Sequence, residues 1–199
     1  ENYFGKNYSF WKYNYNKLIE YFDFFKDISI DDFLKAISAS KPSLIRTEAD
    51  ELTYPIHILI RYEIEKGIFD KTISTDNLNK VWNEKVKEYL GIDVDCDGNG
   101  ILQDIHWTDA SFGYFPAYAL GSAYSAQIYK TMSKQLNIEE ILENNRFEEI
   151  NEWLKNKIHK WGALRTPSEM LISVTNEDFN PIYYIEYLEE KYKKLYELQ

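Results

Sequence analysis

The chain has 199 residues, of which 44% are hydrophobic and 17% aromatic, and its 33 acidic against 23 basic residues give a formal net charge of −10. This hydrophobic fraction is enough for a core and argues against an intrinsically disordered chain. The acidic balance argues against a nucleic-acid-binding protein, which needs a surplus of Lys and Arg. A single cysteine, Cys96, excludes an internal disulfide, and no apolar run is long enough to cross a membrane.

Helical patterns begin at the start of the chain. Aromatic and apolar residues at spacings of three and four predict a long, well-buried helix over residues 3–25. Asp31 and Asp32 precede an apolar run and suit the N-terminus of a second helix, which Pro42 closes.

The third helical segment carries a polar stripe. Thr47 to Asp50 has the spacing of a capping box, and an amphipathic run follows to Gly67, with a kink expected at Pro55. One face carries Asp50, Tyr54, His57 and Arg61. The opposite face carries Leu52, Ile56, Leu59 and Ile60, which we expect to pack. The polar stripe lines a site or forms a partly solvated face, and spacing alone leaves both interpretations open.

The rest of the chain is helical apart from one segment. We expect a helix over 76–90 with Gly91 after its last residue, an irregular Gly-rich segment over about 91–116, and helical structure with breaks over 117–161. Two more helix starts are explicit, at Thr166-Pro167 and at Asn180-Pro181. The sequence therefore predicts one all-α domain over residues 1–199.

The irregular segment opens with alternating carboxylates, Asp93, Asp95 and Asp97, before Gly98. This spacing resembles a calcium-binding loop. Its last position is Asp104, where a bidentate Glu is typical, so a solvated acidic turn is the competing interpretation. A calcium-binding helical module is one alternative function of the chain.

A second feature of the segment is the group His106, Tyr114 and Tyr118, beside Gly113 and Pro116. Such side chains can donate to an oxyanion, and they also suit an aromatic core turn. The chain has only two other histidines, His57 and His159, and no H-E-x-x-H motif, so no zinc site is predicted from its residues.

Two strings resemble family signatures. Ile45 to Asp50 reads I-R-x-x-A-D, and Gly100 to Trp107 reads G-x-x-Q-D-x-H-W. Both resemble motifs of the thermostable carboxypeptidase Taq family of metallocarboxypeptidases, and the similarity extends over essentially the whole chain. The resemblance implies an all-α metallopeptidase that removes single residues from peptide C-termini, usually a cytoplasmic homodimer with zinc or a similar divalent ion.

Members of that family are longer, and their H-E-x-x-H and H-E-S metal-binding segments precede the matched region. The resemblance therefore implies a C-terminal, substrate-binding portion of such an enzyme. Its partners are then the peptide C-terminus, the missing N-terminal half and a second copy. We expect it to hold no metal and to be inactive alone.

The resemblance also implies roles for individual residues. Arg46 is expected to pair with the terminal carboxylate of the substrate, where a planar bidentate donor suits the geometry. Gln103 and Asp104 are expected to support this substrate-binding wall. His106 is expected to stabilise the oxyanion or bind backbone, and Tyr114 or Tyr118 to donate to the tetrahedral intermediate. A helical protein-interaction domain with exposed aromatic faces is the remaining alternative.

Overall fold

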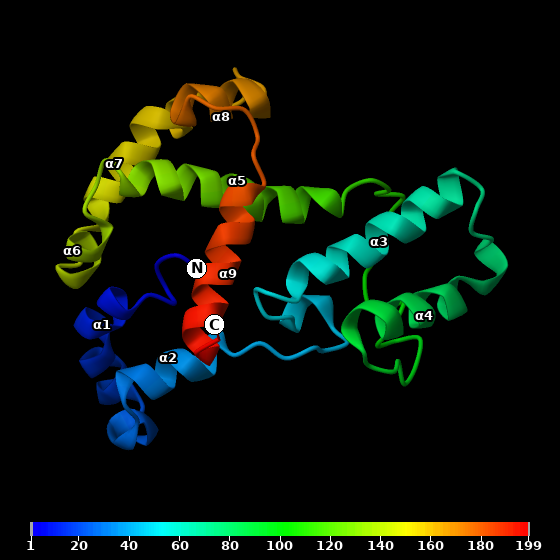
Figure 1. Ribbon diagram of the computed structural model, residues 1–199, viewed down its shortest axis with the longest axis horizontal. Helices are drawn as coiled ribbons and strands as arrows, with labels where there is room; N and C mark the ends of the chain where they lie inside the picture. Colours follow the sequence, from blue (N-terminus) through cyan, green and yellow to red (C-terminus); the bar gives the residue numbers. More distant parts are fainter. Residues whose placement is uncertain (1, 199) are drawn as a thin grey trace. The chain divides into compact units, whose positions relative to one another are not determined.

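The computed structural model describes residues 2–198, which form helices joined by turns, with no strand among them (Figure 1). The predicted all-α fold class is therefore confirmed. The chain divides into two compact units: the described part of Glu1–Ser38 together with Ser122–Gln199, and Ala39–Gly121. Within the described range, no helix is long and apolar enough to cross a membrane. The prediction of a single domain stays a prediction.

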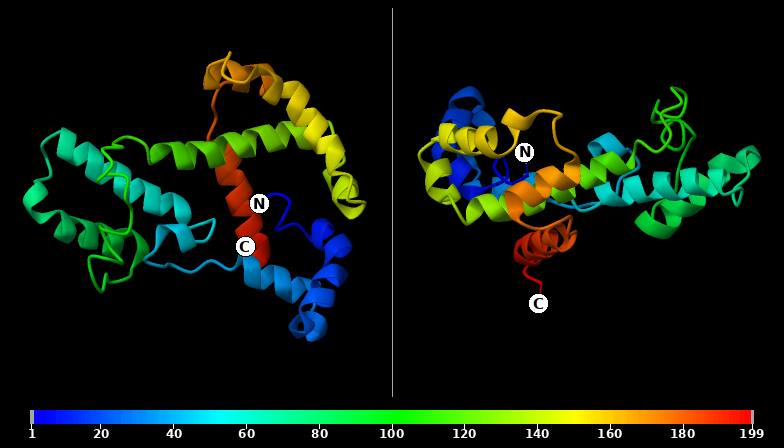
Figure 2. Two further views of the ribbon diagram at one scale, coloured as in Figure 1. Left: turned by 180° about the vertical axis from the view of Figure 1, so that it is seen from behind. Right: turned by 90° about the horizontal axis from the view of Figure 1, so that it is seen from above.

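The first unit contains helices from both ends of the chain. Its elements are α1 (Tyr8–Tyr21), the 3-10 helix η1 (Asp23–Asp27), α2 (Ile30–Ser38), most of α5 (Pro116–Ser133), α6 (Ile138–Glu143), α7 (Phe147–Lys157), η4 (His159–Trp161), α8 (Pro167–Thr175) and α9 (Ile182–Tyr196). Helix α1 packs against α6, as the views of Figure 2 show. One buried cluster forms its core: Met132, Ile138, Ile141, Leu142, Ile150, Trp153 and Val174.

Helix α1 is shorter than the predicted segment 3–25. The side chain of Asn7 caps its start by accepting a hydrogen bond from the Ser9 backbone N–H at 2.7 Å. At the other end the backbone becomes extended at Phe22, and η1 follows. The helix is attached to α6, since the Ser9 hydroxyl donates to Glu139 Oε2 at 2.5 Å.

The two explicit helix starts near the end of the chain are confirmed. Thr166 and Glu169 form a reciprocal capping box at the start of α8, with Pro167 in the first turn. Helix α9 begins at Ile182, directly after Asn180-Pro181, with Pro181 rather than Asn180 in the N-cap position. Asn180 Oδ1 accepts a hydrogen bond from the Ile182 backbone N–H at 3.1 Å. Side-chain acceptors satisfy free N–H groups at both helix ends.

The second unit contains η2 (Arg46–Glu48), α3 (Tyr54–Phe69), η3 (Thr75–Asn77), α4 (Leu78–Leu90) and the first residues of α5. Helices α3 and α4 lie side by side (Figure 1). Ile60, Ile64, Trp82, Val86 and Leu90 form the buried cluster between them. Residues 91–115 contain neither helix nor strand, which confirms the predicted irregular segment.

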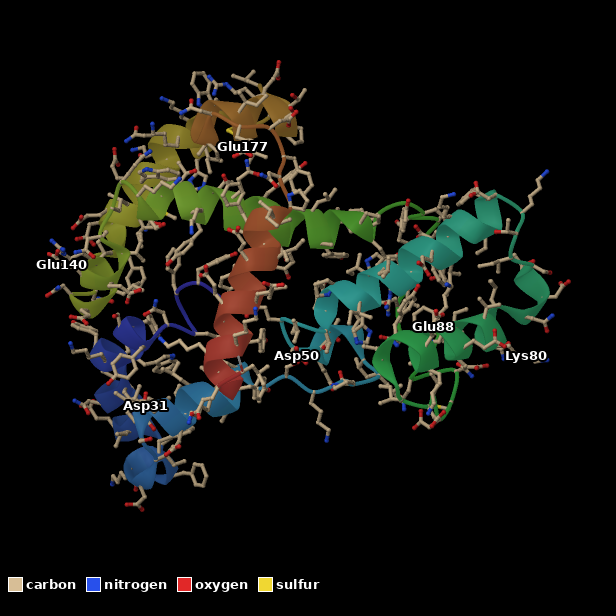
Figure 3. All side chains as sticks on the ribbon, viewed as in Figure 1. Asp31, Asp50, Lys80, Glu88, Glu140 and Glu177 are labelled. Carbon is tan, nitrogen blue, oxygen red and sulfur yellow. The ribbon has the colours of Figure 1, made fainter. Side chains whose placement is uncertain are left out.

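The prediction for the start of α3 is wrong. The helix begins at Tyr54 rather than after Thr47, and Pro55 lies in its first turn, where the missing N–H causes no kink. Asp50 precedes this end of α3 (Figure 3), and its carboxylate accepts hydrogen bonds from the backbone N–H groups of Leu52 and Thr53 at 2.9 and 3.0 Å.

The prediction that the apolar face of α3 packs is only partly right. Ile60 is fully buried and Ile56 is half-buried, but Leu52 and Leu59 are exposed. The buried face of α3 instead includes polar residues of the predicted stripe, His57 and Arg61. A partly solvated face is therefore the wrong interpretation for these two side chains.

Candidate functional site

The carboxylate of Asp104 lies between two arginines of the second unit. Arg46 donates to it from Nη2 at 2.7 Å and from Nε at 3.2 and 3.3 Å. Arg61 donates from Nε at 2.7 Å, and its Nη2 is 2.5 Å from the same carboxylate. The side chain of Arg61 is only 1% exposed, so this is a buried ion-pair cluster.

Gln103 connects the two motifs through the backbone. Its Oε1 accepts a hydrogen bond from the backbone N–H of Arg46 at 2.8 Å. Its Nε2 donates to the carbonyls of Leu44, Asn99 and Gly100, each at 3.0 Å. The amide therefore fixes the segment before η2 against the turn after Asp97, and so holds Arg46 beside Asp104.

The charges of the cluster stabilise one another. Burial of Asp104 opposes its ionisation, but its hydrogen bond to Arg46 and the charge of Arg61 outweigh burial and lower its pKa. Burial likewise opposes the charge of Arg46, but the bond to Asp104 raises its pKa above the usual value. For Arg61 burial dominates and lowers the pKa to about 10, so the side chain stays charged at neutral pH.

Aromatic rings surround the guanidinium of Arg46. Its Nη1 donates to the Tyr54 hydroxyl at 3.0 Å, and its central carbon lies 5.1 Å from the ring centre of Tyr118 and 5.7 Å from that of Phe115. These positions allow cation–π attraction. The bonds to Asp104 and Tyr54 use three of the five N–H groups of the guanidinium.

His106 and the two predicted tyrosines form one group. His106 Nε2 is 3.2 Å from the Tyr118 hydroxyl, and its Nδ1 is 4.0 Å from Asp104 Oδ1. The ring of Tyr114 is stacked near that of His106, with centres 5.7 Å apart, and about half of Tyr114 is exposed. All six residues predicted for the site thus lie in the second unit, close to Asp104 or to its immediate neighbours.

Two buried residues were not assigned to the site by the motifs. One is Arg61, whose place on the same helical face as His57 was the only signal in the sequence. The other is Glu65, one turn further along α3. Its carboxylate accepts from Trp107 Nε1 at 2.6 Å and from the Gly113 backbone N–H at 2.9 Å. Glu65 therefore fixes the loop that carries His106 and Tyr114.

His57 is buried beside the cluster, with an exposure of only 1%. Burial, with the positive charges of Arg61 and Arg46, lowers its pKa to about 4. The imidazole is therefore neutral at physiological pH.

The calcium interpretation is not supported by the arrangement of the acidic turn. Asp104 is bound to two arginines, Asp93 pairs with Lys87 at 2.8 Å, and Asp95 accepts from the Asn99 amide at 3.0 Å. Within residues 2–198, no group of three or more His, Cys, Asp or Glu side chains could hold a metal ion.

Comparison with known proteins gives consistent matches. A family model described as Carboxypeptidase Taq (M32) metallopeptidase matches residues 1–192. Carboxypeptidase 1 of Bacillus subtilis is 48% identical over 198 residues, which are 98% of this chain and 40% of that protein. Thermostable carboxypeptidase 1 of Thermus thermophilus is 36% identical over 197 residues, which are 98% of this chain and 39% of that protein.

Solved structures agree. The crystal structure of BsuCP superposes with a TM-score of 0.92 at 48% identity, over 98% of this chain and 39% of that one. The Pyrococcus furiosus carboxypeptidase structure superposes with a TM-score of 0.93 at 36% identity, over 96% of this chain and 39% of that one. The chain thus spans about two fifths of the length of these relatives and matches their C-terminal portion.

Proposed function

The chain belongs to the carboxypeptidase Taq (M32) family of metallopeptidases, and from this premise we propose that it forms the substrate-binding wall of a metal-dependent carboxypeptidase. That enzyme hydrolyses the C-terminal peptide bond of a peptide. The observation that carries the proposal is the cluster of Arg46, Arg61 and Asp104. Two guanidinium groups share one carboxylate, which gives the cluster a surplus of one positive charge.

A surplus positive charge beside aromatic rings favours a carboxylate ligand. The environment is partly desolvated, so an ion pair formed there is stronger than one in water. Arg46 is the residue that binds the terminal carboxylate in this proposal, with N–H groups not used by Asp104 and Tyr54. Gln103 and Asp104 support it, since both bond to Arg46.

His106, Tyr114 and Tyr118 are the proposed donors to the oxyanion of the tetrahedral intermediate. The contact of His106 with Tyr118 and the stacking of His106 near Tyr114 keep the three rings together. A donor held in place before the reaction needs no reorganisation when charge develops. Removal of one such donor is expected to raise the barrier by about 2.7–4 kcal/mol.

The metal of the intact enzyme, zinc or a similar divalent ion, is proposed to bind residues outside this chain. The described residues do not offer a ligand set for it, so no step that involves the metal is assigned to them. The isolated chain is accordingly expected to be inactive. We further propose, from the family alone, that the intact enzyme is a cytoplasmic homodimer.

A chimera tests this function. This chain replaces the matching 40% of Bacillus subtilis carboxypeptidase 1, and release of C-terminal amino acids from a short peptide is measured with and without a divalent metal. We expect metal-dependent release by the chimera. Arg46→Ala is expected to raise KM, and Arg165→Ala, which removes an arginine stacked on Trp161 in the other unit, is expected to leave it unchanged. A folded chimera that releases nothing refutes the proposal.

A further inference from the structure

An apolar stripe runs along the outer face of α3. Leu59, Tyr62 and Phe69 are 40%, 45% and 66% exposed, at spacings of three and seven residues, and Pro55 continues the stripe toward the start of the helix. The opposite face is buried, with Ile60 and Ile64 fully covered. Lys66 interrupts the stripe between Tyr62 and Phe69, where it pairs with Asp70. Apart from Lys66 the stripe is apolar, so α3 has apolar side chains on an exposed face as well as on its buried face, which is typical of a helix that a further element covers.

Two cavities lie along this stripe, both within the second unit. One has a volume of 310 Å³ and lies between α3 and the first turns of α5, where Leu59 and Leu120 line it. The other has a volume of 440 Å³ and lies between α3 and the loop that contains Phe112. Tyr62 and Pro116 line both cavities, so the two are neighbours along α3, and the apolar surface that contains them is called the groove below.

The groove has the dimensions of a helix-binding site. From Pro55 to Phe69 it extends about 21 Å along α3, at 1.5 Å per residue, which is about four turns of a partner helix. Its walls are mainly apolar, and such a surface binds the apolar face of an amphipathic helix. Contiguous exposed apolar surface of this kind marks an interaction site.

We propose that this groove binds an apolar helix from the part of the M32 fold that this chain does not span. This inference rests on the proposed function. The matched relatives contain a further three fifths of their length in the same molecule, and that polypeptide is the partner that the groove requires. The groove lies beside helices α3 and α5 and has mainly apolar walls, so an amphipathic helix is the partner element whose apolar face suits it.

The groove is also connected to the proposed site. Glu65 lines the 440 Å³ cavity and holds the Trp107 indole and the Gly113 backbone N–H. The loop between these two residues follows His106 and precedes Tyr114. A helix in the groove therefore covers the residue that anchors this loop, and binding is expected to protect the Gly113 amide from hydrogen exchange.

Co-expression tests the docking surface. The part of Bacillus subtilis carboxypeptidase 1 that this chain does not match is expressed with an affinity tag, together with the untagged 199-residue chain, and the captured amount of the chain is measured. We expect one copy of the chain per tagged polypeptide. Leu59→Glu and Tyr62→Glu are expected to reduce capture at least tenfold, because a carboxylate is then placed in an apolar contact. The matched control Leu164→Glu, at a highly exposed leucine of the other unit, is expected to leave capture unchanged.

Each remaining outcome has a defined meaning. Capture of Leu59→Glu at the wild-type level refutes the groove, as does self-association of the chain alone that Leu59→Glu abolishes, since the partner is then a second copy. If the tagged polypeptide is insoluble, thermal unfolding of the chimera replaces capture, and equal melting temperatures for Leu59→Glu and Leu164→Glu refute the proposal. If Leu59→Glu reduces capture but the chimera has no peptidase activity, the proposed function alone is refuted. If the chimera is active but Leu59→Glu leaves capture of the chain unchanged, this inference alone is refuted.

Discussion

Replacement of Asp104 by asparagine tests whether the two motifs form one electrostatic unit. The Asp104→Asn change keeps the side chain nearly the same size, but it removes the negative charge between two guanidinium groups that are 7% and 1% exposed. Removal of one partner from a buried ion pair typically costs about 3–5 kcal/mol, because the remaining charge is left uncompensated. Here two positive charges remain, so we expect a loss of stability of about 3–5 kcal/mol for the second unit.

Urea unfolding followed by circular dichroism measures this loss. Asp95→Asn is the matched control: this exposed carboxylate accepts hydrogen bonds from the Asn99 amide at the surface, and the unfolding curve of the variant is expected to coincide with that of the wild type. A double-mutant cycle sharpens the test. In an Arg61→Met background the same Asp104→Asn change should cost less, since one of the uncompensated charges is gone. A loss below about 1 kcal/mol for Asp104→Asn, close to that of an ordinary surface substitution, refutes the argument.

Three further predictions concern individual side chains: His57, Glu65 and Thr166. The pKa of His57 is about 4 in the folded chain and about 6.5 when exposed. The unfolded state therefore binds more protons between these two values, and the free energy of unfolding falls as the pH drops through that window. Denaturant unfolding should show a loss of about 2 kcal/mol from about pH 7.5 to pH 5, and the His57→Gln variant should not show it. Glu65→Gln leaves one partly buried N–H donor, of Trp107 or Gly113, without an acceptor and should cost about 1 kcal/mol. We also expect faster hydrogen exchange at the Gly113 amide, and unchanged exchange contradicts the anchoring role. Thr166→Ala removes the N-cap of α8 and should cost about 1 kcal/mol in thermal unfolding, and no shift in the melting temperature contradicts the cap.

The sequence predicts the fold class and the helix ends that local chemistry determines. Thr166 caps α8 as predicted, and the side chain of Asn180 binds the Ile182 backbone N–H at the start of α9, because such hydrogen bonds involve residues only two or three positions apart. The predicted start of α3 is wrong for a related reason. Thr47 and Asp50 both suit an N-terminal position, and sequence spacing does not show that the Asp50 carboxylate binds the backbone of Leu52 and Thr53 instead.

The site residues were predictable only as far as the motifs reach. The family resemblance singled out Arg46 and Asp104, and the structure brings them together across 58 residues. Arg61 and Glu65 lie outside both motifs, and their partners come from the distant loop 104–113. Periodicity along α3 indicates which residues share a face, but only the tertiary fold determines whether that face meets solvent or a charged partner.

Leu59 of α3, which was predicted to pack but is exposed, bears on the proposed function. Leu59 follows a pattern that predicts burial, but 40% of this residue is exposed. Local sequence and global fold usually agree in natural proteins, so such a conflict indicates that Leu59 contacts polypeptide that is not part of this chain. The relatives contain three fifths of their length beyond the matched region, and a helix from that region would remove the conflict by covering Leu59. The same surface borders Glu65, which anchors the loop of His106 and Tyr114. The residue that contradicts the packing prediction therefore marks the position where the rest of an M32 enzyme would contact the proposed substrate-binding wall.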